Sequence, residues 1–488
     1  MRWPPTIVCG AAVLLAPLWL WRPAFQCYYL RLDDFVYLSR GRLAANLERG
    51  AMTPHNGHLT PLFLLETHLV ARAAGSLEAL PAFLGWAAFA GLAATMAGVG
   101  HVVARQTGRV DWGLAAMAGF GLSTVPGPAL LWYSASQALL TGAVVTAMLA
   151  ALELWSARGW LVALALAVTL AAAAPFCWSA GYTAGLVGAA YLCADARRGA
   201  RSAAVALALA SVLAAALAWT LAGDAIREST RLARLSLTDV RVVSRILDHS
   251  NQAVWEKLVF NNLGLDVRTT PGQATVLSGV VLAAWLVRRF RAQTGAVRSL
   301  WNPLTAAGAA IVVINYMLIF STRGRSLGYE HLRNLGWYDA VPQIGAVLWV
   351  AGVWAGPRVP CWHRPLEPPS PRGLSCAVAF AALLFIMQAP RARRILFEYD
   401  GMAARVARLG APRNALAIDW PARAREQRSV LARFDRIERD QERDPVSRAE
   451  LARHVSQLNV PGAPPDMPGY RLVDLVDPEP ASRQRVDH

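Results

Sequence analysis

Long stretches of apolar residues with almost no charge dominate this sequence and limit what the chain can fold into. Residues 79–100, 202–222 and 304–320 are each close to the ~20 residues that an α-helix needs to cross a lipid bilayer. Charged residues make up only 16% of the chain, whereas an ordinary soluble domain carries about 25%. These features disfavour a disordered chain and a soluble globular protein. The sequence predicts an all-α, polytopic membrane protein.

The apolar segments predict about eleven membrane spans. The expected spans are residues 5–21, 79–104, 112–125, 136–155, 160–175, 180–194, 202–222, 274–287, 304–320, 341–356 and 373–389. The first span follows Arg2, as in a secretory signal, but Trp21-Arg22-Pro23 offers no small-residue cleavage site. We therefore expect this span to be retained.

The placement of arginine predicts the orientation, because Lys and Arg in short loops mark the cytoplasmic side. With the amino terminus inside, the inner loops carry Arg105, Arg109, Arg158, Arg197, Arg198, Arg201, Arg288, Arg289, Arg291, Arg298, Arg358, Arg364 and Arg372. The short outer turns at 126–135 and 176–179 carry no basic residue. We expect a bacterial inner (plasma) membrane protein with a cytoplasmic amino terminus and an extracytoplasmic carboxyl terminus.

Three expected outer loops, residues 22–78, 223–273 and 321–340, are long or rich in arginine and depart from this rule. Long outer segments escape it, so these loops are also where we expect function. The sequence of the second loop predicts an amphipathic helix around residues 227–247, followed by a second segment at residues 255–265. This loop could serve as a lid or as scaffold.

Composition divides the chain into two regions. Residues 1–390 hold the apolar segments and are expected to form the transmembrane domain. Residues 391–488 are charged and proline-rich, and predict a small extracytoplasmic region with short helices near 423–440 and 446–458.

The net charge of +16 does not indicate a nucleic-acid partner. Nearly all of the 48 basic residues are arginines, and they are spread through loops instead of forming a basic patch with interleaved aromatic residues. The six cysteines show neither CxxC spacing nor a compact framework, so we interpret them as packing residues.

An acidic pair, Asp33 and Asp34, follows the first span. Two adjacent carboxylates at a membrane surface could bind a divalent cation, or one could accept a proton while the other orients the acceptor. The pair is also typical of the first turn of a helix, where the helix dipole favours negative charge. Both interpretations stay open at this point.

Two histidines follow in the same loop. His55 and His58 lie in a proline-flanked motif that leads into residues 58–74, which are too polar for a span and predict an interfacial helix. The histidines could bind phosphate, move a proton or ligate a metal such as Mg or Mn. Asp33 and Asp34 would be the other metal ligands. The alternative is a polar turn closed by Asn-Gly.

An aromatic turn begins the fourth expected span. Trp132, Tyr133 and Gln137 could stack on a sugar and hydrogen-bond to it. The alternative is an interfacial aromatic belt of the kind that anchors membrane helices.

A basic loop follows the ninth expected span. Arg323, Arg325 and Arg333 form a cluster suited to phosphate, since a guanidinium offers a planar fork of donors and stays charged. Tyr329 and His331 lie in the same loop and are further candidates for substrate binding. The alternative is binding to anionic lipid headgroups or a solvated loop.

The order of these features resembles the GT-C superfamily of integral-membrane glycosyltransferases, in particular the bacterial branch similar to protein mannosyltransferases and aminoarabinose transferases. Residues 32–158 carry most of the resemblance: an outer loop with Asp33-Asp34, helices entered through His58 to Pro61, and many Ala/Leu/Gly-rich spans. Residues 323–333 resemble the basic outer loop near the last spans of that family.

The resemblance implies transfer of a sugar from a polyprenyl-phosphate donor to an acceptor glycan, lipid or protein at the outer face of the membrane. Asp33 or Asp34 would deprotonate the acceptor. The arginines of the basic loop would hold the leaving phosphate, and the two histidines would bind phosphate or acceptor. Many relatives carry Asp-Glu where this chain has Asp-Asp, so the resemblance leaves the base unassigned.

Two other classes of protein fit the same composition. A lipid transporter or flippase would place polar residues inside broken spans, whereas these spans contain few, among them Glu153 and Asn315. A non-catalytic scaffold of the cell envelope would tolerate the change Asp34→Asn without loss of activity.

Overall fold

The computed structural model describes residues 5–26, 28, 30, 33–55, 58–194, 199–291, 302–355, 366–367, 369–399, 427–429, 431–432 and 434–436. The elements formed by these residues are helices, and no β-sheet occurs among them. The prediction of an all-α chain is confirmed.

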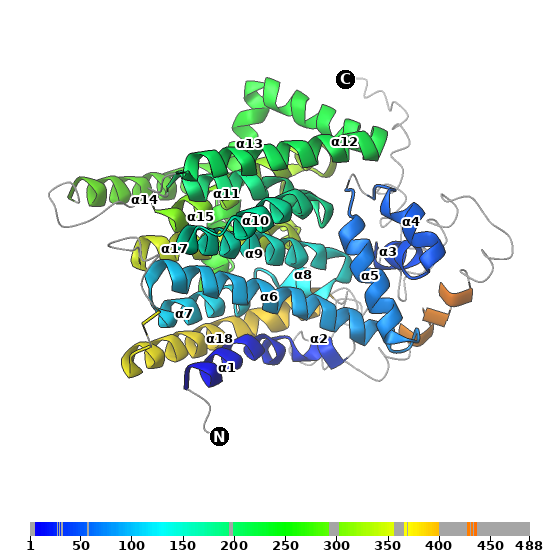
Figure 1. Cartoon of the computed structure of the whole chain (residues 1–488), viewed down its shortest axis with the longest axis horizontal. Helices are drawn as coiled ribbons and strands as arrows, with labels where there is room; N and C mark the ends of the chain where they lie inside the picture. Colours follow the sequence, from blue (N-terminus) through cyan, green and yellow to red (C-terminus); the bar gives the residue numbers. More distant parts are fainter. Residues whose placement is uncertain are drawn as a thin grey trace.

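The long helices run alongside one another in a bundle (Figure 1). Those that overlap the expected spans are α1 (Pro5–Leu20), α6 (Leu80–Thr107), α7 (Val110–Gly121), α9 (Gln137–Arg158), α10 (Leu161–Ala173), α11 (Ala184–Cys193), α12 (Ala200–Thr238), α14 (Pro271–Arg291), α15 (Pro303–Leu327), α17 (Ala340–Ala355) and α18 (Pro371–Tyr399). The other α-helices are α2 (Arg22–Gln26), α3 (Asp33–Gly41), α4 (Ala44–Ala51), α5 (Pro61–Ala74), α8 (Gly127–Leu131), α13 (Val240–Ala253) and α16 (Tyr329–Asn334). The short 3-10 helices are η1 (Tyr133–Ser136), η2 (Ala174–Phe176), η3 (Ser179–Thr183), η5 (Asn261–Leu263) and η7 (Gly336–Asp339). The element η4 (Val254–Phe260) is a π-helix.

Five helical stretches of the described chain are long and apolar enough to cross a membrane. They are Leu80–Thr107, Tyr133–Arg158, Ala200–Ala218, Pro303–Gly324 and Pro371–Leu396. Pro5–Leu20, Leu161–Phe176 and Pro271–Ala284 are apolar but shorter. The chain is thus a helical membrane protein, but the expected count of about eleven spans is not confirmed. Helices such as α7 and α11, with 12 and 10 residues, are short for a bilayer.

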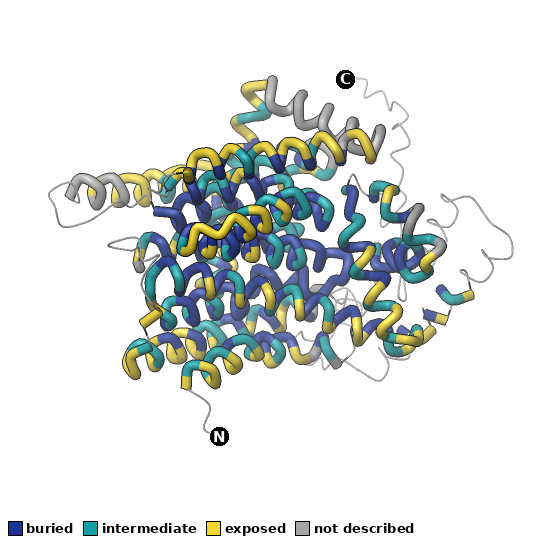
Figure 2. Tube along the Cα trace, in the orientation of Figure 1, coloured by how far each residue is buried: buried dark blue, intermediate teal, exposed yellow. Residues whose placement is uncertain are grey.

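The outer surface of the bundle is apolar as well as its interior. Large apolar side chains on peripheral helices are strongly exposed, among them Leu161 (75%), Val162 (81%), Leu213 (67%) and Ile386 (69%). Figure 2 shows this exposed layer on α10, α12 and α18, around a buried centre. An apolar surface of this extent suits lipid and not water.

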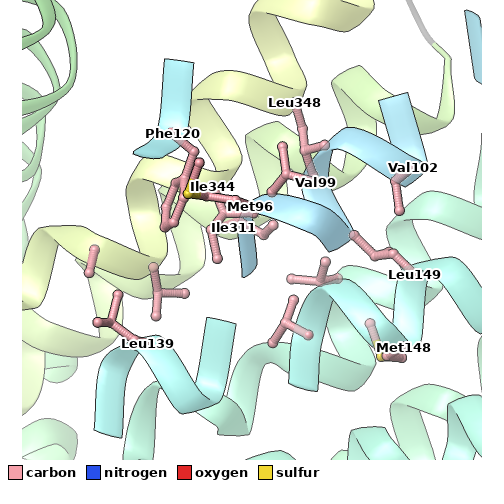
Figure 3. Close-up of a cluster of buried hydrophobic side chains, with 14 of the residues drawn as sticks. Met96, Val99, Val102, Phe120, Leu139, Met148, Leu149, Ile311, Ile344 and Leu348 are labelled. Carbon is pink, nitrogen blue, oxygen red and sulfur yellow. The ribbon is translucent and has the colours of Figure 1, made fainter. Parts of the chain in front are cut away.

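The centre of the bundle is filled by aliphatic, methionine and aromatic side chains. Met96 on α6, Phe120 on α7, Met148 on α9 and Ile344 on α17 are all buried in one cluster (Figure 3). Small residues allow the closest approach: a Cβ atom at Gly308 on α15 would lie 2.6 Å from the carbonyl oxygen of Gly345 on α17. Such contacts are typical of helix pairs in membranes.

The boundary between α12 and α13 differs from the prediction. The sequence predicts that the span ends at residue 222 and that a separate amphipathic helix covers 227–247, whereas α12 continues to Thr238 and α13 begins at Val240. Asp239 sets the break, because its carboxylate accepts the backbone N–H of Arg241 at 2.9 Å and caps α13.

The C-terminal region returns to the first outer loop. Its described residues beyond α18 are 427–436 without 430 and 433, and they include Leu431 and Phe434, which pack with Phe35 of α3 (Figure 1). The rings of Phe35 and Phe434 are 5.3 Å apart. The second helix expected in this region, 446–458, lies outside the described residues. The first outer loop and this part of the C-terminal region therefore lie at the same end of the bundle.

Candidate functional site

The short helices α3, α4 and α5 gather at one end of the bundle (Figure 1). Helix α5 begins with Pro61 in its first turn and ends at Gly75, whose φ of 68° is left-handed. It buries Phe63 and Thr67 and exposes Leu65 and Leu69. The helix expected over residues 58–74 forms over Pro61–Ala74 only, because residues 58–60 are not helical, and its two-sided surface suits a membrane interface.

The two carboxylates of the acidic pair face different environments. Asp34 is fully buried, and its carboxylate accepts the backbone N–H of Ser134 at 2.6 Å. The side chain of Asp33 is 24% exposed, and its Oδ1 lies 3.2 Å from Nε2 of His55. Both residues belong to the first turn of α3. Asp34 therefore joins α3 to η1, whereas Asp33 is the carboxylate that is partly exposed.

Tyr37, one turn after Asp33, helps to hold His55. Its ring lies edge-on to the imidazole at 5.2 Å and edge-on to Phe63 at 5.1 Å. Burial and the charge of Asp33 raise the pKa of Tyr37 to about 12. The phenol therefore stays protonated and acts as a neutral support for the histidine.

The two predicted histidines form a small bridge of their own. The backbone N–H of each donates to the carbonyl of the other, and both N···O distances are 2.8 Å. The bridge is antiparallel and fixes His55 and His58 side by side. Leu59, directly after the bridge, packs against Ala218 of α12 and so anchors it to the bundle.

His58 contacts an arginine of the predicted basic loop, at a point where α15 is still helical. Its Nε2 lies 3.0 Å from a guanidinium nitrogen of Arg323, near the end of α15. Burial, with the positive charge of Arg323, lowers the pKa of His58 well below its ordinary value, so the ring is neutral. Because arginine can only donate, Nε2 accepts and the ring proton lies on Nδ1. That Nδ1 atom is buried and has no hydrogen-bond partner.

These contacts define a polar row, which consists of Asp33, His55, His58 and Arg323. A carboxylate stands at one end, a guanidinium stands at the other, and the bridged histidines lie between them. Three of the predicted sequence regions supply its members, and the chain separation of His58 and Arg323 is 265 residues.

Aromatic rings border the row beside His58. The ring of Trp178 lies 6.2 Å from that of His58 and stacks on Tyr338 at 5.5 Å. Tyr338 contacts Trp337, which meets the predicted candidate Trp132 edge-on at 4.8 Å. Trp132 is thus one end of an aromatic series that reaches the row, and it is itself 8% exposed.

Tyr133 and Gln137 lie in the interior instead of facing a substrate. The hydroxyl of Tyr133 is 3.0 Å from that of Thr67, and its ring packs on Phe63. Gln137 donates to the carbonyl of Ser134. Both are buried, because η1 and α5 press together here. Their positions suit packing and not the predicted binding of a sugar.

Arg323 and Arg333 of the predicted arginine cluster have different partners and do not form one cluster. Arg333 is buried and pairs with Glu256 on η4, with 3.4 Å between Nε and Oε2. Tyr329 stacks on His249 with ring centres 5.1 Å apart, and His331 is exposed. The side chain of Arg325 lies outside the described part. Of the arginines described here, Arg323 is the one that reaches the histidines.

Sequence reasoning missed one acid in this region. Glu66 lies on α5, and its Oε2 is buried without a hydrogen-bond partner. Burial raises the pKa of Glu66 from its ordinary 4.5 to about 7. The available signal was a single acid directly after the apolar stretch Leu62 to Leu65, which the span prediction treated only as one of the polar residues that exclude a span.

The four predicted metal ligands do not converge. Among the described residues, no group of three or more His, Cys, Asp and Glu side chains is placed to hold a metal ion. Asp33 and His55 are paired, but Asp34 is directed to Ser134 and His58 to a cationic guanidinium. The expected Mg or Mn site is therefore not formed by this arrangement.

No family model, curated protein or solved structure matches the chain.

Proposed function

We propose that this chain is a membrane glycosyltransferase that resembles the GT-C superfamily. It transfers a sugar from a polyprenyl-phosphate donor to an acceptor glycan, lipid or protein at the outer face of the membrane. The observation that carries the proposal is the polar row, because its bridged histidines contact a reachable carboxylate at one end and a guanidinium at the other. Such a transfer needs a base at the acceptor and a cation at the leaving phosphate.

Asp33 is the proposed base. Its carboxylate is partly exposed and lies against His55, which orients it. Asp34 already accepts a backbone N–H in the interior and has the role of a positioning residue. This division assigns the two carboxylates of the pair to different tasks.

Arg323 and His58 are the proposed phosphate contacts. The guanidinium supplies a permanent positive charge, and the neutral ring supplies an N–H at Nδ1 that has no partner within the protein. Nδ1 and Nε2 point to different sides of the imidazole, so two different oxygens of a phosphate would accept from the ring N–H and from the guanidinium. Hydrogen bonds of this charge-assisted kind are about twice as strong as neutral ones.

The proposed reaction is a displacement at the anomeric carbon. The acceptor hydroxyl gives its proton to Asp33 while its oxygen bonds to that carbon. The bond from the anomeric carbon to the phosphate oxygen breaks, and its electron pair leaves with the polyprenyl phosphate. The new charge on the phosphate is stabilised by Arg323.

The location of the row supports a lipid-linked donor. The row lies at one end of helices whose outer surfaces are apolar, so a polyprenyl chain can stay in lipid while its phosphate reaches Arg323. Arg105, Arg158 and Arg201 lie at the far ends of α6, α9 and α12. This distribution favours a cytoplasmic far end and an extracytoplasmic site.

The test is donor turnover by purified protein in detergent or liposomes, measured as release of polyprenyl phosphate from a panel of polyprenyl-phosphate sugars in the presence of candidate acceptors. We expect release by the wild type and loss of release in Asp33→Asn. Asp266→Asn is a matched control, since Asp266 is exposed and its pair with Arg394 lies at the surface. Release that is equal in Asp33→Asn, Asp34→Asn and wild type would remove the mechanism and favour a transporter or a scaffold.

A further inference from the structure

Glu66 is an acid of α5 that the proposed reaction does not use, and its carboxylate is partly buried. It lies in the second turn of α5, between Leu65, which is 43% exposed, and Thr67, which is fully buried. One of its carboxylate oxygens, Oε2, is buried and accepts no hydrogen bond, while the residue as a whole is partly exposed. The side chain thus lies at the boundary between the surface of α5 and the contact that α5 makes with η1.

The buried oxygen of this carboxylate lacks a hydrogen-bond donor within the protein. Burial of a polar group without a hydrogen bond is costly, and burial of an unpaired charge more so. Protonation reduces the cost, in keeping with the pKa of about 7. A proton on one oxygen nevertheless leaves both the new O–H and the remaining lone pairs to be satisfied. A hydroxyl-bearing ligand would supply what the protein does not.

The neighbours of Glu66 connect it to the polar row. Helix α5 contacts η2, and burial together with the charge of Glu66 raises the pKa of Cys177, which directly follows η2. Cys177 is adjacent to Trp178, whose ring contacts His58. Glu66 and the phosphate contacts of the row therefore flank the same turn, which follows η2.

We infer that Glu66 binds hydroxyl groups of the donor sugar. The inference rests on the proposed function, because the ligand next to the His58 and Arg323 phosphate contacts is the sugar attached to that phosphate. The sugar hydroxyls donate to the Glu66 carboxylate, while the phosphate is held at Arg323. Glu66 is in this role a substrate-binding residue, and the acceptor is held separately at Asp33.

This assignment predicts a particular dependence on pH. Hydroxyl groups donate to the ionised carboxylate, so the donor binds better when Glu66 has lost its proton. The KM for the donor should fall as pH rises from 6 to 8 through the pKa of about 7. A purely structural Glu66 would change stability with pH but would not change the KM for the donor in this way.

The experiment compares wild type, Glu66→Gln, Glu66→Ala and the control Glu78→Gln, whose side chain is exposed shortly after α5. For each, the KM for donor, the KM for acceptor and kcat are measured between pH 6 and 8, and folding is checked by thermal melting. We expect Glu66→Gln to raise the donor KM about tenfold at pH 8, the effect of one lost charge-assisted hydrogen bond. Its donor KM should no longer depend on pH, and its acceptor KM should be unchanged.

Three results would count against the inference, and they are distinct. If wild type and Glu66→Gln have the same donor KM at every pH, Glu66 does not bind the sugar, although the transferase proposal stands. If only the acceptor KM rises, Glu66 belongs to the acceptor site. If wild type turns over no donor of the panel with any acceptor tested, the proposed function fails and this inference fails with it. Should Glu66→Ala unfold, the isosteric Glu66→Gln still provides the comparison.

Discussion

The imidazole of His58 and the guanidinium of Arg323 lie 3.0 Å apart although 265 residues separate them in the chain. The contact joins the first outer loop to the end of α15. It also fixes the proton of the neutral ring on Nδ1, since arginine cannot accept a hydrogen bond. One contact therefore connects two distant segments. It also leaves the Nδ1–H of His58 as a donor without a hydrogen-bond partner.

The first prediction concerns this contact. We expect Arg323→Gln to lower kcat at least 100-fold, because a neutral amide cannot stabilise the charge of a leaving phosphate. Arg323→Lys should retain part of the activity, since the charge remains but the planar fork is lost. The measurement is the rate at which polyprenyl phosphate is released from the donor panel. Arg372→Gln, at an exposed arginine of α18, is the matched control. Full activity of Arg323→Gln would contradict the proposed role.

The second prediction separates the two aspartates by stability. Asp34→Ala leaves the buried N–H of Ser134 without its acceptor, so we expect a loss of about 1–3 kcal/mol in unfolding free energy. Asp34→Asn keeps an acceptor oxygen and should lose less. Asp33→Ala should melt near the wild-type temperature, because that carboxylate is partly exposed. Thermal melting of the three variants is the measurement, and the opposite order would refute the assignment of roles.

The architecture could be predicted from the sequence to a large extent. Long apolar stretches without charge, such as residues 304–320, specify helices directly, because a lipid environment leaves few other ways to satisfy the backbone. Their ends are harder to predict. The break between α12 and α13 depends on the cap at Asp239, and the sequence around Gly223 resembles a boundary just as closely.

The site could be predicted only as a set of residue types. Asp33 and Asp34 are equivalent in sequence, and their different environments arise from the position of η1, which is set by distant packing. Arg323 and Arg333 are close in sequence, yet α16 and the turn before it carry Arg333 to Glu256. Glu66 shows its burial only once α5 is packed. Each of these outcomes depends on contacts between segments far apart in the chain.

The third prediction concerns orientation. With native cysteines replaced by serine, Ser76→Cys near the end of α5 should react with a membrane-impermeant maleimide added to intact spheroplasts. Arg158→Cys, at the far end of α9, should react only after the membrane is permeabilised. Both positions are exposed, so accessibility to the reagent depends on the side of the membrane. The reverse pattern would place the polar row in the cytoplasm.

The fourth prediction follows from the raised pKa of Glu66. Between pH 4.5 and about 7 the folded chain holds a proton that the unfolded chain has lost, so stability falls as pH rises through this window. The full effect, reached above pH 7, is at most about 3 kcal/mol. Glu66→Gln removes it. The melting temperature of this variant should therefore exceed that of wild type more at pH 8 than at pH 5. An equal difference at the two pH values would mean that burial does not raise this pKa.

The fifth prediction concerns the C-terminal segment. Phe434 is fully buried and packs on Phe35, which directly follows Asp34 in α3. Phe434→Ala should therefore loosen α3 and lower its protection in hydrogen exchange, at a local cost of about 3 kcal/mol. Because Asp33 and Asp34 begin the same helix, kcat should fall more than the donor KM rises. Arg436→Ala, at an exposed position of the same segment, is the control. If exchange at residues 33–41 is unchanged in Phe434→Ala, the C-terminal segment does not stabilise α3. If exchange rises and kcat stays constant, the placement of Asp33 does not depend on the packing of α3.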